Sequence, residues 1–209
     1  MTPLVSDVKF FWEIFVTLLV ITDPPGVVPV FLGMTATRPA TQRNRLALQA
    51  ALVALGVIVA FAVFGRSILD YLGVELPSLQ AAGGLLLLLV ALELLTGRGP
   101  DPADLERAKA NVAFVPLGTP LLAGPGAIVA TMLFVQRIGS VGGGVAFSAA
   151  IVAVVAVLWS AMRFSGVVLR LLGASGVELL TRIAGVLLSA IAVQLIVDAI
   201  RALIRIGIT

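Results

Sequence analysis

Long apolar runs alternate with short polar connections along the whole chain. Six of these runs are long enough to cross a bilayer, because a membrane-spanning helix needs about 20 mainly apolar residues. In chain order they cover about residues 8–35, 46–72, 77–95, 113–137, 143–172 and 178–204. The pattern therefore predicts an all-α polytopic membrane protein, with six transmembrane helices in one transmembrane domain that covers residues 1–209.

Two of the six runs are interrupted by proline and glycine. The first contains "VITDPPGVVPVF" (20–31), and the fourth contains "PLGTPLLAGPGAIVAT" (116–131). Proline lacks a backbone N–H and its ring clashes with the preceding turn, so each interruption leaves carbonyls without donors. Such groups are costly in hydrocarbon and must be buried in protein or line a wet cavity. We therefore expect the first and fourth helices to be broken inside the membrane.

The two halves of the chain align at one fixed offset of 101 residues, without a gap. The aligned pairs include Pro24 with Pro125, Gly65 with Gly166, Gly84 with Gly185, and Glu93 with Gln194. Each half holds three spans, which is an odd number, so the second copy enters the membrane from the opposite side. The sequence thus predicts two inverted three-helix repeats, at about 8–96 and 113–204, joined by a charged loop at about 97–112.

Basic residues are distributed unevenly between the two sides of this topology. One side carries nine: Arg38, Arg43, Arg45, Arg98, Arg107, Lys109, Arg163, Arg170 and Arg182. The other side carries five: Lys9, Arg66, Arg137, Arg201 and Arg205. Because cytoplasmic loops are enriched in Lys and Arg, we expect both termini outside the cytoplasm and the charged loop inside it.

Composition supports the membrane class and excludes several functions. The chain is 60% hydrophobic and 12% charged, with a mean hydropathy of +1.14. The excess of 14 basic over 11 acidic residues forms no basic cluster interleaved with aromatics, so nucleic acid is not an expected partner. Cys and His are both missing, and no nucleophile and base fall at one depth. We therefore expect no enzyme activity, no metal and no cofactor.

The two interruptions are the candidate binding site, since paired breaks in corresponding positions of two halves are typical of transporters. Free N–H groups of half-helices beginning near Gly26 and Gly126 suit a carboxylate. The carboxylate of Asp23 and freed carbonyls near Ile21 and Thr22 suit an ammonium group. Small residues at the second break leave room for a small ligand. The candidate substrate-binding residues are Thr22, Asp23, Pro24, Gly26, Thr119, Ala123, Gly124, Pro125 and Gly126.

Other roles for these residues stay open. The breaks can be packing kinks without a ligand, and Asp23 can be a helix N-cap. No nucleotide-binding motif is present, so transport would use a gradient, with Asp23 or Glu93 as candidate sites for proton or ion coupling. Glu93 can instead be a snorkelling or paired acid near the membrane surface. A channel or uniporter for another small solute, and a membrane scaffold that transports nothing, are the alternative functions.

The interrupted segments also carry a family resemblance. "DPPGVVPVF", "PLLAGPGAIVAT" and "TRIAGVLLSAIAVQLI" resemble segments of the MarC family of bacterial and archaeal inner-membrane proteins, and the likeness covers all six spans. Its broken-helix motifs fall on Asp23, Pro24, Gly26 and Pro29, and on Ala123, Gly124, Pro125 and Gly126. One departure is Val27, where many relatives have a polar residue, often Asn.

The resemblance implies a function and a location. SnatA-type members of the family carry glycine, alanine and similar substrates, and export is the proposed role of some relatives. We therefore expect a secondary transporter of small neutral amino acids, working by alternating access around two broken helices in the inner membrane. Its partners would be the amino acid and the lipid bilayer, and a homo-oligomer is left open.

Overall fold

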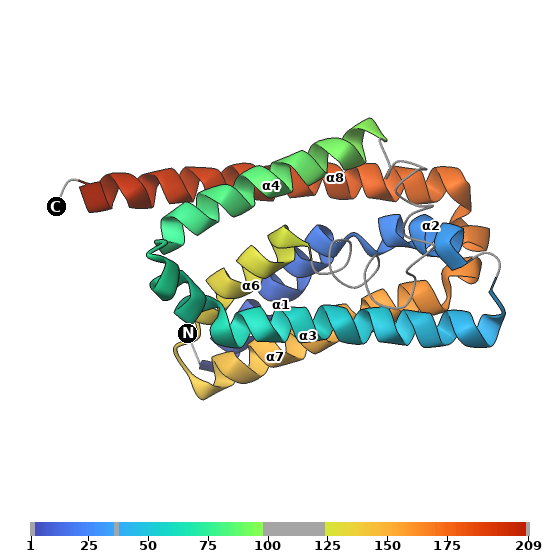
Figure 1. The fold of residues 1–209 in the computed structure, drawn as a ribbon, viewed down its shortest axis with the longest axis horizontal. Coiled ribbons are helices and arrows are strands. Elements are labelled where there is room, and N and C mark those ends of the chain that lie inside the picture. Colours follow the sequence, from blue (N-terminus) through green and yellow to red (C-terminus); the bar gives the residue numbers. More distant parts are fainter. Residues whose placement is uncertain (1–2, 36–37, 98–123, 208–209) are drawn as a thin grey trace.

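The computed structural model describes residues 3–35, 38–97 and 124–207, and within these ranges every regular element is a helix. The helices are α1 (Pro3–Thr22), α2 (Pro24–Thr35), α3 (Ala40–Leu72), α4 (Leu76–Thr96), α6 (Pro125–Gln136), α7 (Val141–Arg163) and α8 (Ser165–Gly207). In the view of Figure 1, α4 and α8 form one layer, α3 and α7 form another, and the three shorter helices lie between them.

Five helices are long and apolar enough to cross a membrane. These spans are Ser6–Thr35, in which α1 and α2 are counted together, and then Ala40–Leu72, Leu76–Thr96, Val141–Arg163 and Ser165–Arg205. Gly126–Gln136 is a shorter apolar helix. The prediction of an all-α polytopic membrane protein of about six helices is thereby confirmed. The first half of the predicted fourth span, at 113–123, lies outside the described residues.

The outer surface of the bundle is apolar. Large side chains such as Trp12 (55% exposed), Phe64 (60%), Leu89 (51%) and Val145 (64%) face outward from α1, α3, α4 and α7. Such a surface is unfavourable in water but suits hydrocarbon, because lipid tails are as apolar as these side chains. The bundle therefore contacts the lipid bilayer around its circumference.

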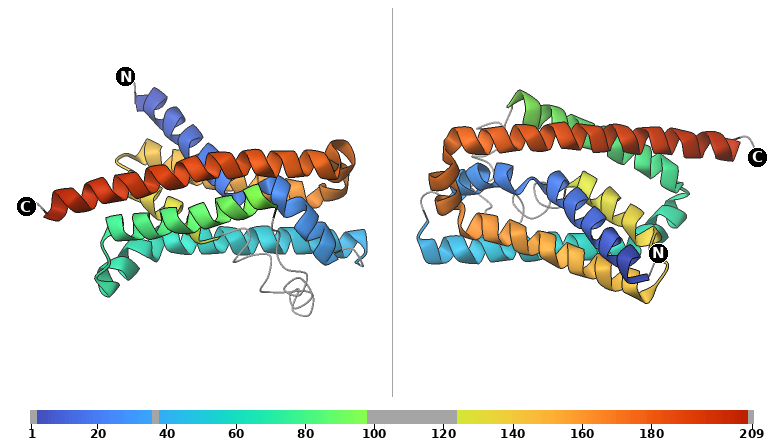
Figure 2. Two further views of the ribbon diagram at one scale, coloured as in Figure 1. Left: turned by 90° about the horizontal axis from the view of Figure 1, so that it is seen from above. Right: turned by 180° about the vertical axis from the view of Figure 1, so that it is seen from behind.

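Both chain termini lie at the same end of the bundle, which we call the termini end (Figure 1; Figure 2 gives two further views). This end also holds the turn from α3 to α4 and the turn from α6 to α7. The opposite end holds the connection from α2 to α3, the end of α4 and the turn from α7 to α8. The start of α6 lies in the middle of the bundle, as does the junction of α1 with α2.

Proline and glycine set several helix ends. Both α2 and α6 begin on a proline, Pro24 and Pro125, where the missing N–H costs nothing because the first turn has no acceptor for it. Gly73 ends α3 with φ of 65°, a left-handed conformation that a residue without Cβ adopts at low cost. Each of the two half-helices contains 12 residues, so both their starts and their ends are 101 residues apart.

The structure differs from the sequence prediction at the fifth and sixth spans. One helix was expected over 143–172, but α7 ends at Arg163 and α8 begins at Ser165. Phe164 leaves helical geometry with φ of −104° and ψ of 19°. A second interruption follows at Gly173, where φ of 66° and ψ of 172° bend α8. No proline marks Phe164, and hydrophobic periodicity alone did not locate that break, whereas Gly173 falls in the predicted connection between the spans 143–172 and 178–204.

Helices α4 and α8 pack closely through glycine, and the contact is reciprocal. A Cβ built on Gly84 would lie 2.9 Å from the carbonyl oxygen of Ala192 in α8. A Cβ built on Gly185 would lie 3.2 Å from the carbonyl oxygen of Ala91 in α4. The buried core of this contact consists of Leu87, Ala91, Leu188 and Ala192, in which the last two residues follow the first two by 101 positions. Small residues here let the two backbones approach.

Candidate functional site

Asp23 forms the break between α1 and α2. Its φ is 38°, which makes it the one non-glycine residue with positive φ in the described part of the chain. The backbone continues across the break through two hydrogen bonds: the Asp23 N–H donates to the Leu19 carbonyl (3.2 Å), and the Val27 N–H donates to the Asp23 carbonyl (3.1 Å). A left-handed conformation at a non-glycine residue is costly, and such strain is concentrated at functional sites.

The Asp23 side chain is buried and lacks hydrogen-bond partners. The residue is 6% exposed, and neither carboxylate oxygen has a partner among the residues that the structure describes. The nearest donors are the Gly26 backbone N–H and the Thr181 hydroxyl, but neither completes a well-formed hydrogen bond. A buried carboxylate without partners is expensive, and in a membrane protein it marks a candidate functional site.

Two adjacent prolines leave further polar backbone groups at this break. Pro24 and Pro25 have no N–H, so the carbonyls four residues earlier, those of Val20 and Ile21, have no helical donor. The first N–H that α2 can offer is that of Gly26, and the Asp23 carboxylate lies beside it. In this conformation the start of α2 therefore faces the protein's own carboxylate.

The second break lies at the start of α6. Gly124 is the N-cap, and its carbonyl accepts the N–H groups of Ala127 (3.0 Å) and Ile128 (3.2 Å). Because Pro125 has no N–H, Gly126 supplies the first free donor of this helix. The positive end of the helix dipole adds to this donor, so the start of α6 suits an anionic group.

The two breaks lie against each other. A Cβ built on Gly126 would be 3.4 Å from the Cγ2 atom of Ile21, which precedes the first break by two residues. The same Cβ would be only 2.0 Å from the Cδ2 atom of Leu87 in α4. The expected open space beside Gly126 is thus filled by Leu87, so this glycine serves close packing of α6 on α4.

The remaining predicted residues lie in different environments. The Thr22 hydroxyl donates to the Leu18 carbonyl (2.8 Å), so it is directed toward its own helix. Glu93 is exposed near the end of α4, away from the helix junction in the middle of the bundle. Thr119 and Ala123 lie outside the described residues.

The sequence reasoning missed Thr181. Its hydroxyl lies on α8 beside Asp23, and it too has no hydrogen-bond partner in the described part of the chain. A signal was available, because Thr181 continues the stripe of buried residues Gly185, Leu188 and Ala192 at spacings of four, three and four along α8. A lone hydroxyl on such a stripe points toward the protein interior.

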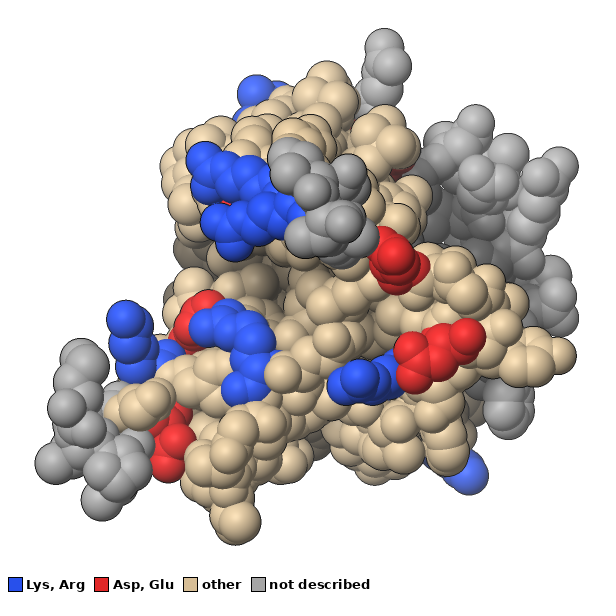
Figure 3. All heavy atoms as spheres, turned by 90° about the vertical axis from the view of Figure 1, so that its left-hand side faces the viewer, with Lys and Arg blue, Asp and Glu red and all other residues tan. Residues whose placement is uncertain are grey.

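An ion pair closes the space between α1 and α6 at the termini end. The Arg137 guanidinium donates to both oxygens of Glu13, with distances of 2.5 and 3.0 Å. The guanidinium also lies over the rings of Phe10 (5.4 Å) and Phe134 (5.5 Å). Figure 3 shows this end of the molecule, where basic and acidic side chains are interspersed. In this conformation α1 and α6 are held together on that side of the breaks.

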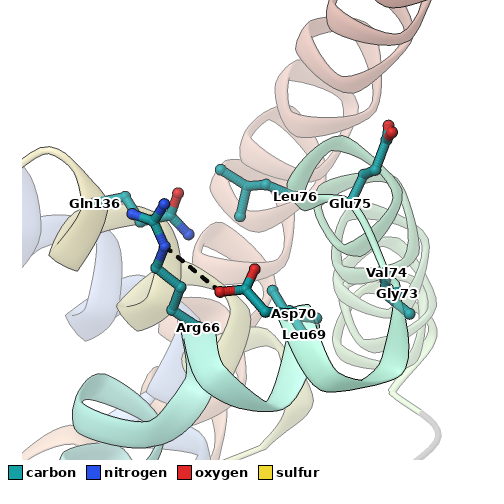
Figure 4. A pocket seen from close by; sticks show the side chains of 8 residues that line it. All are labelled: Arg66, Leu69, Asp70, Gly73, Val74, Glu75, Leu76 and Gln136. Carbon is teal, nitrogen blue, oxygen red and sulfur yellow. Dashed lines mark ion pairs between the residues drawn. The ribbon is translucent and has the colours of Figure 1, made fainter.

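Two open cavities also lie at the termini end. One, of about 460 Å³, is lined by the turn from α3 to α4 and by Gln136 of α6 (Figure 4). Arg66 and Asp70 form an exposed ion pair on its wall, with 3.9 Å between Nε and Oδ2. The other, of about 430 Å³, surrounds the pair of Glu13 and Arg137. Neither cavity is lined by residues of the two breaks.

These observations define a polytopic helical membrane protein with a buried polar break at its centre. The MarC family model, described as "MarC family integral membrane protein", matches residues 8–204, and the chain belongs to this family.

Relatives are found in archaea and bacteria. A UPF0056 membrane protein of Methanocaldococcus jannaschii is 36% identical, over 93% of this chain and 98% of its own length. The UPF0056 membrane protein YhcE of Escherichia coli is 31% identical, over 93% of this chain and 94% of its own. The inner membrane protein MarC of Citrobacter koseri is 30% identical, over 91% and 93%. No solved structure gives a significant match.

Proposed function

We propose that the protein is a secondary transporter of small neutral amino acids that binds its substrate at the two helix breaks. The observation that carries this proposal is the carboxylate of Asp23, which is buried at a strained break and has no hydrogen-bond partner within residues 3–35, 38–97 and 124–207. A carboxyl group kept without partners inside a membrane protein is best explained by a cationic partner that binds and leaves.

A zwitterion matches the groups at the two breaks. Asp23 and the carbonyls of Val20 and Ile21 would receive the ammonium group, and the N–H of Gly126 at the start of α6 would receive the carboxylate. Leu87 limits the space beside Gly126, which favours a substrate with a small side chain. The resemblance to SnatA-type proteins supports glycine and alanine as the first substrates to test.

We further propose that the two halves are inverted repeats, which supplies the rocking motion that alternating access needs. The reciprocal contacts of Gly84 with Ala192 and of Gly185 with Ala91 support it, because a two-fold axis makes each contact occur twice. Helices α4 and α8 run in opposite directions, as an axis in the membrane plane requires (Figure 1).

The charge distribution supports an orientation. The termini end carries five of the 14 basic residues, and three of them pair with acids: Arg137 with Glu13, Arg66 with Asp70 and Arg201 with Asp198. The nine basic residues that the sequence predicts for the opposite side, three of which lie outside the described residues, would make that side cytoplasmic. Both termini would then lie outside the cytoplasm of a bacterial or archaeal cell, and the pair of Glu13 and Arg137 would close the outward side.

Uptake into liposomes tests the proposed function. Purified protein should carry labelled glycine or alanine into vesicles, and Asp23→Ala should reduce the rate to that of protein-free vesicles, because the ammonium loses its counter-charge. Asp70→Ala is the control, since it removes a carboxylate that is 73% exposed at the termini end. Equal uptake by protein-free vesicles, wild type and Asp23→Ala would overturn the proposal.

A further inference from the structure

The side chains of Asp23 and of Thr181 in α8 both lie next to Gly26. A Cβ built on Gly26 would be 2.0 Å from the Asp23 Oδ2 atom and 3.3 Å from the Thr181 Oγ1 atom, so both oxygens lie on the same side of this residue. Both are shielded from solvent, and neither has a hydrogen-bond partner among the described residues. The absence of a side chain at Gly26 creates the space in which the two groups approach each other.

Three other threonines in the described part of the chain satisfy their hydroxyls locally. Thr22, Thr35 and Thr96 donate to the carbonyls four residues earlier, at 2.8, 2.7 and 2.8 Å. This bond is the usual solution for a hydroxyl in an apolar helix. Thr181 does not form it, and its hydroxyl is placed beside a carboxylate instead. The buried hydroxyl of Thr131 on α6 also lacks a partner in the described ranges, but it is not one of the groups beside Asp23.

The chemistry of this cluster defines its ligand. The carboxylate of Asp23 and the hydroxyl of Thr181 both present oxygen, and only the carboxylate can carry a full charge. Oxygen atoms around a single negative charge suit a monovalent cation. We propose that Thr181 and Asp23 together form the cation-binding half of the site, which accepts either the ammonium group of the substrate or an alkali cation such as Na⁺.

This inference rests on the proposed function and adds α8 to it. Asp23 lies in the first half of the chain, between α1 and α2, and Thr181 lies in the second half, in α8. A cation held between them therefore bridges the two halves. Occupancy of the site would then stabilise the packing of α2 on α8. Ligand binding to the folded state stabilises it by RT ln(1 + L/Kd), where L is the free ligand concentration, so binding at the cluster can be measured by thermal unfolding without a transport assay.

Thermal unfolding of the purified full-length protein tests the inference. Wild type, Thr181→Val, Thr181→Ser and Asp23→Asn are titrated with NaCl against choline chloride at constant ionic strength, and separately with glycine. Wild type should be stabilised by at least one ligand. Thr181→Val keeps the shape of the side chain but removes the hydroxyl, so the ligand concentration at half-maximal stabilisation should rise about tenfold. Thr181→Ser keeps a hydroxyl, so this concentration should stay at the wild-type value. Stabilisation by NaCl identifies an alkali cation, and stabilisation by glycine alone identifies the ammonium group.

Controls separate this inference from the proposed function. Thr96→Val removes an exposed hydroxyl and should titrate as wild type does. Thr181→Ala is a second hydroxyl-free variant, used if Thr181→Val unfolds without ligand. If Thr181→Val or Thr181→Ala responds to ligand as the wild type does, while Asp23→Asn no longer responds, the role of Thr181 is overturned and the proposed function still stands. Failure of both ligands to stabilise the wild type would contradict both.

Discussion

Alanine at position 26 is expected to reduce amino acid uptake by at least about tenfold while the protein still folds. A Cβ at this position would lie 2.0 Å from the Oδ2 atom and 2.9 Å from the Cγ atom of Asp23, so the carboxylate must move away. Gly26 lies within α2 in helical geometry, and alanine is compatible with that backbone. The loss should therefore come from displacement of Asp23, measured as the initial rate of labelled glycine uptake into liposomes.

A matched control lies on the same helix. Gly33 is exposed in α2 and nothing lies within 4 Å of a Cβ built on it, so Gly33→Ala should transport at the wild-type rate. If Gly26→Ala is as active as Gly33→Ala, then the position of the Asp23 carboxylate against Gly26 is not needed for binding.

The second large effect is expected at the contact between α4 and α8. A Cβ on Gly84 would lie 2.7 Å from the Ile196 Cγ1 atom, 2.9 Å from the Ala192 carbonyl oxygen and 3.2 Å from the Ile196 nitrogen. Two of these atoms belong to the backbone of α8, so the helices must separate to admit a methyl group. Gly84→Ala should destabilise the protein by about 1–3 kcal/mol, the usual range for overpacking, measured by thermal unfolding in detergent.

Two further variants serve as the control and as the reciprocal test for this prediction. Gly56→Ala on α3 meets nothing within 4 Å, and should be neutral or slightly stabilising because alanine is the better helix former. Gly185→Ala repeats the test at the reciprocal position, where the Cβ would lie 3.1 Å from the Leu94 Cβ atom. It should destabilise less than Gly84→Ala. A melting temperature of Gly84→Ala equal to that of Gly56→Ala would contradict the close packing of α4 on α8.

Much of the fold could be predicted from local signals. Pro24 and Pro125 mark the starts of α2 and α6, and Pro77 lies in the first turn of α4, because proline is favoured in the first turn, where its missing N–H would have no helical acceptor. The length and apolarity of the runs set the membrane class. The 101-residue offset also aligned Gly84 with Gly185, which the structure places at reciprocal points of one contact.

Features that depend on tertiary packing were less accessible. The end of α7 at Arg163 follows from the geometry of Phe164 in the turn, and no proline marks it. Leu87 fills the space beside Gly126, although small residues around a break predicted free volume.

The candidate site was only partly predictable for the same reason. The carboxylate of Asp23 was predictable from the break in which it lies. Its neighbour Thr181 is separated from it by most of the chain, and only the packing of α2 on α8 brings the two together. Glu93 was chosen for its charge within an apolar run, but the structure leaves it exposed near the end of α4.

Counterflow measures the central claim most directly, because it separates a transporter from a channel and from a scaffold. Liposomes containing the protein are loaded with unlabelled glycine and diluted into a trace of labelled glycine. A carrier that alternates around the break at Asp23 should accumulate label transiently above its equilibrium level, and Asp23→Asn should abolish this overshoot. Label that equilibrates without an overshoot would indicate a pore, and label that enters no faster than in protein-free vesicles would indicate a protein that does not transport glycine. Either result would contradict the account.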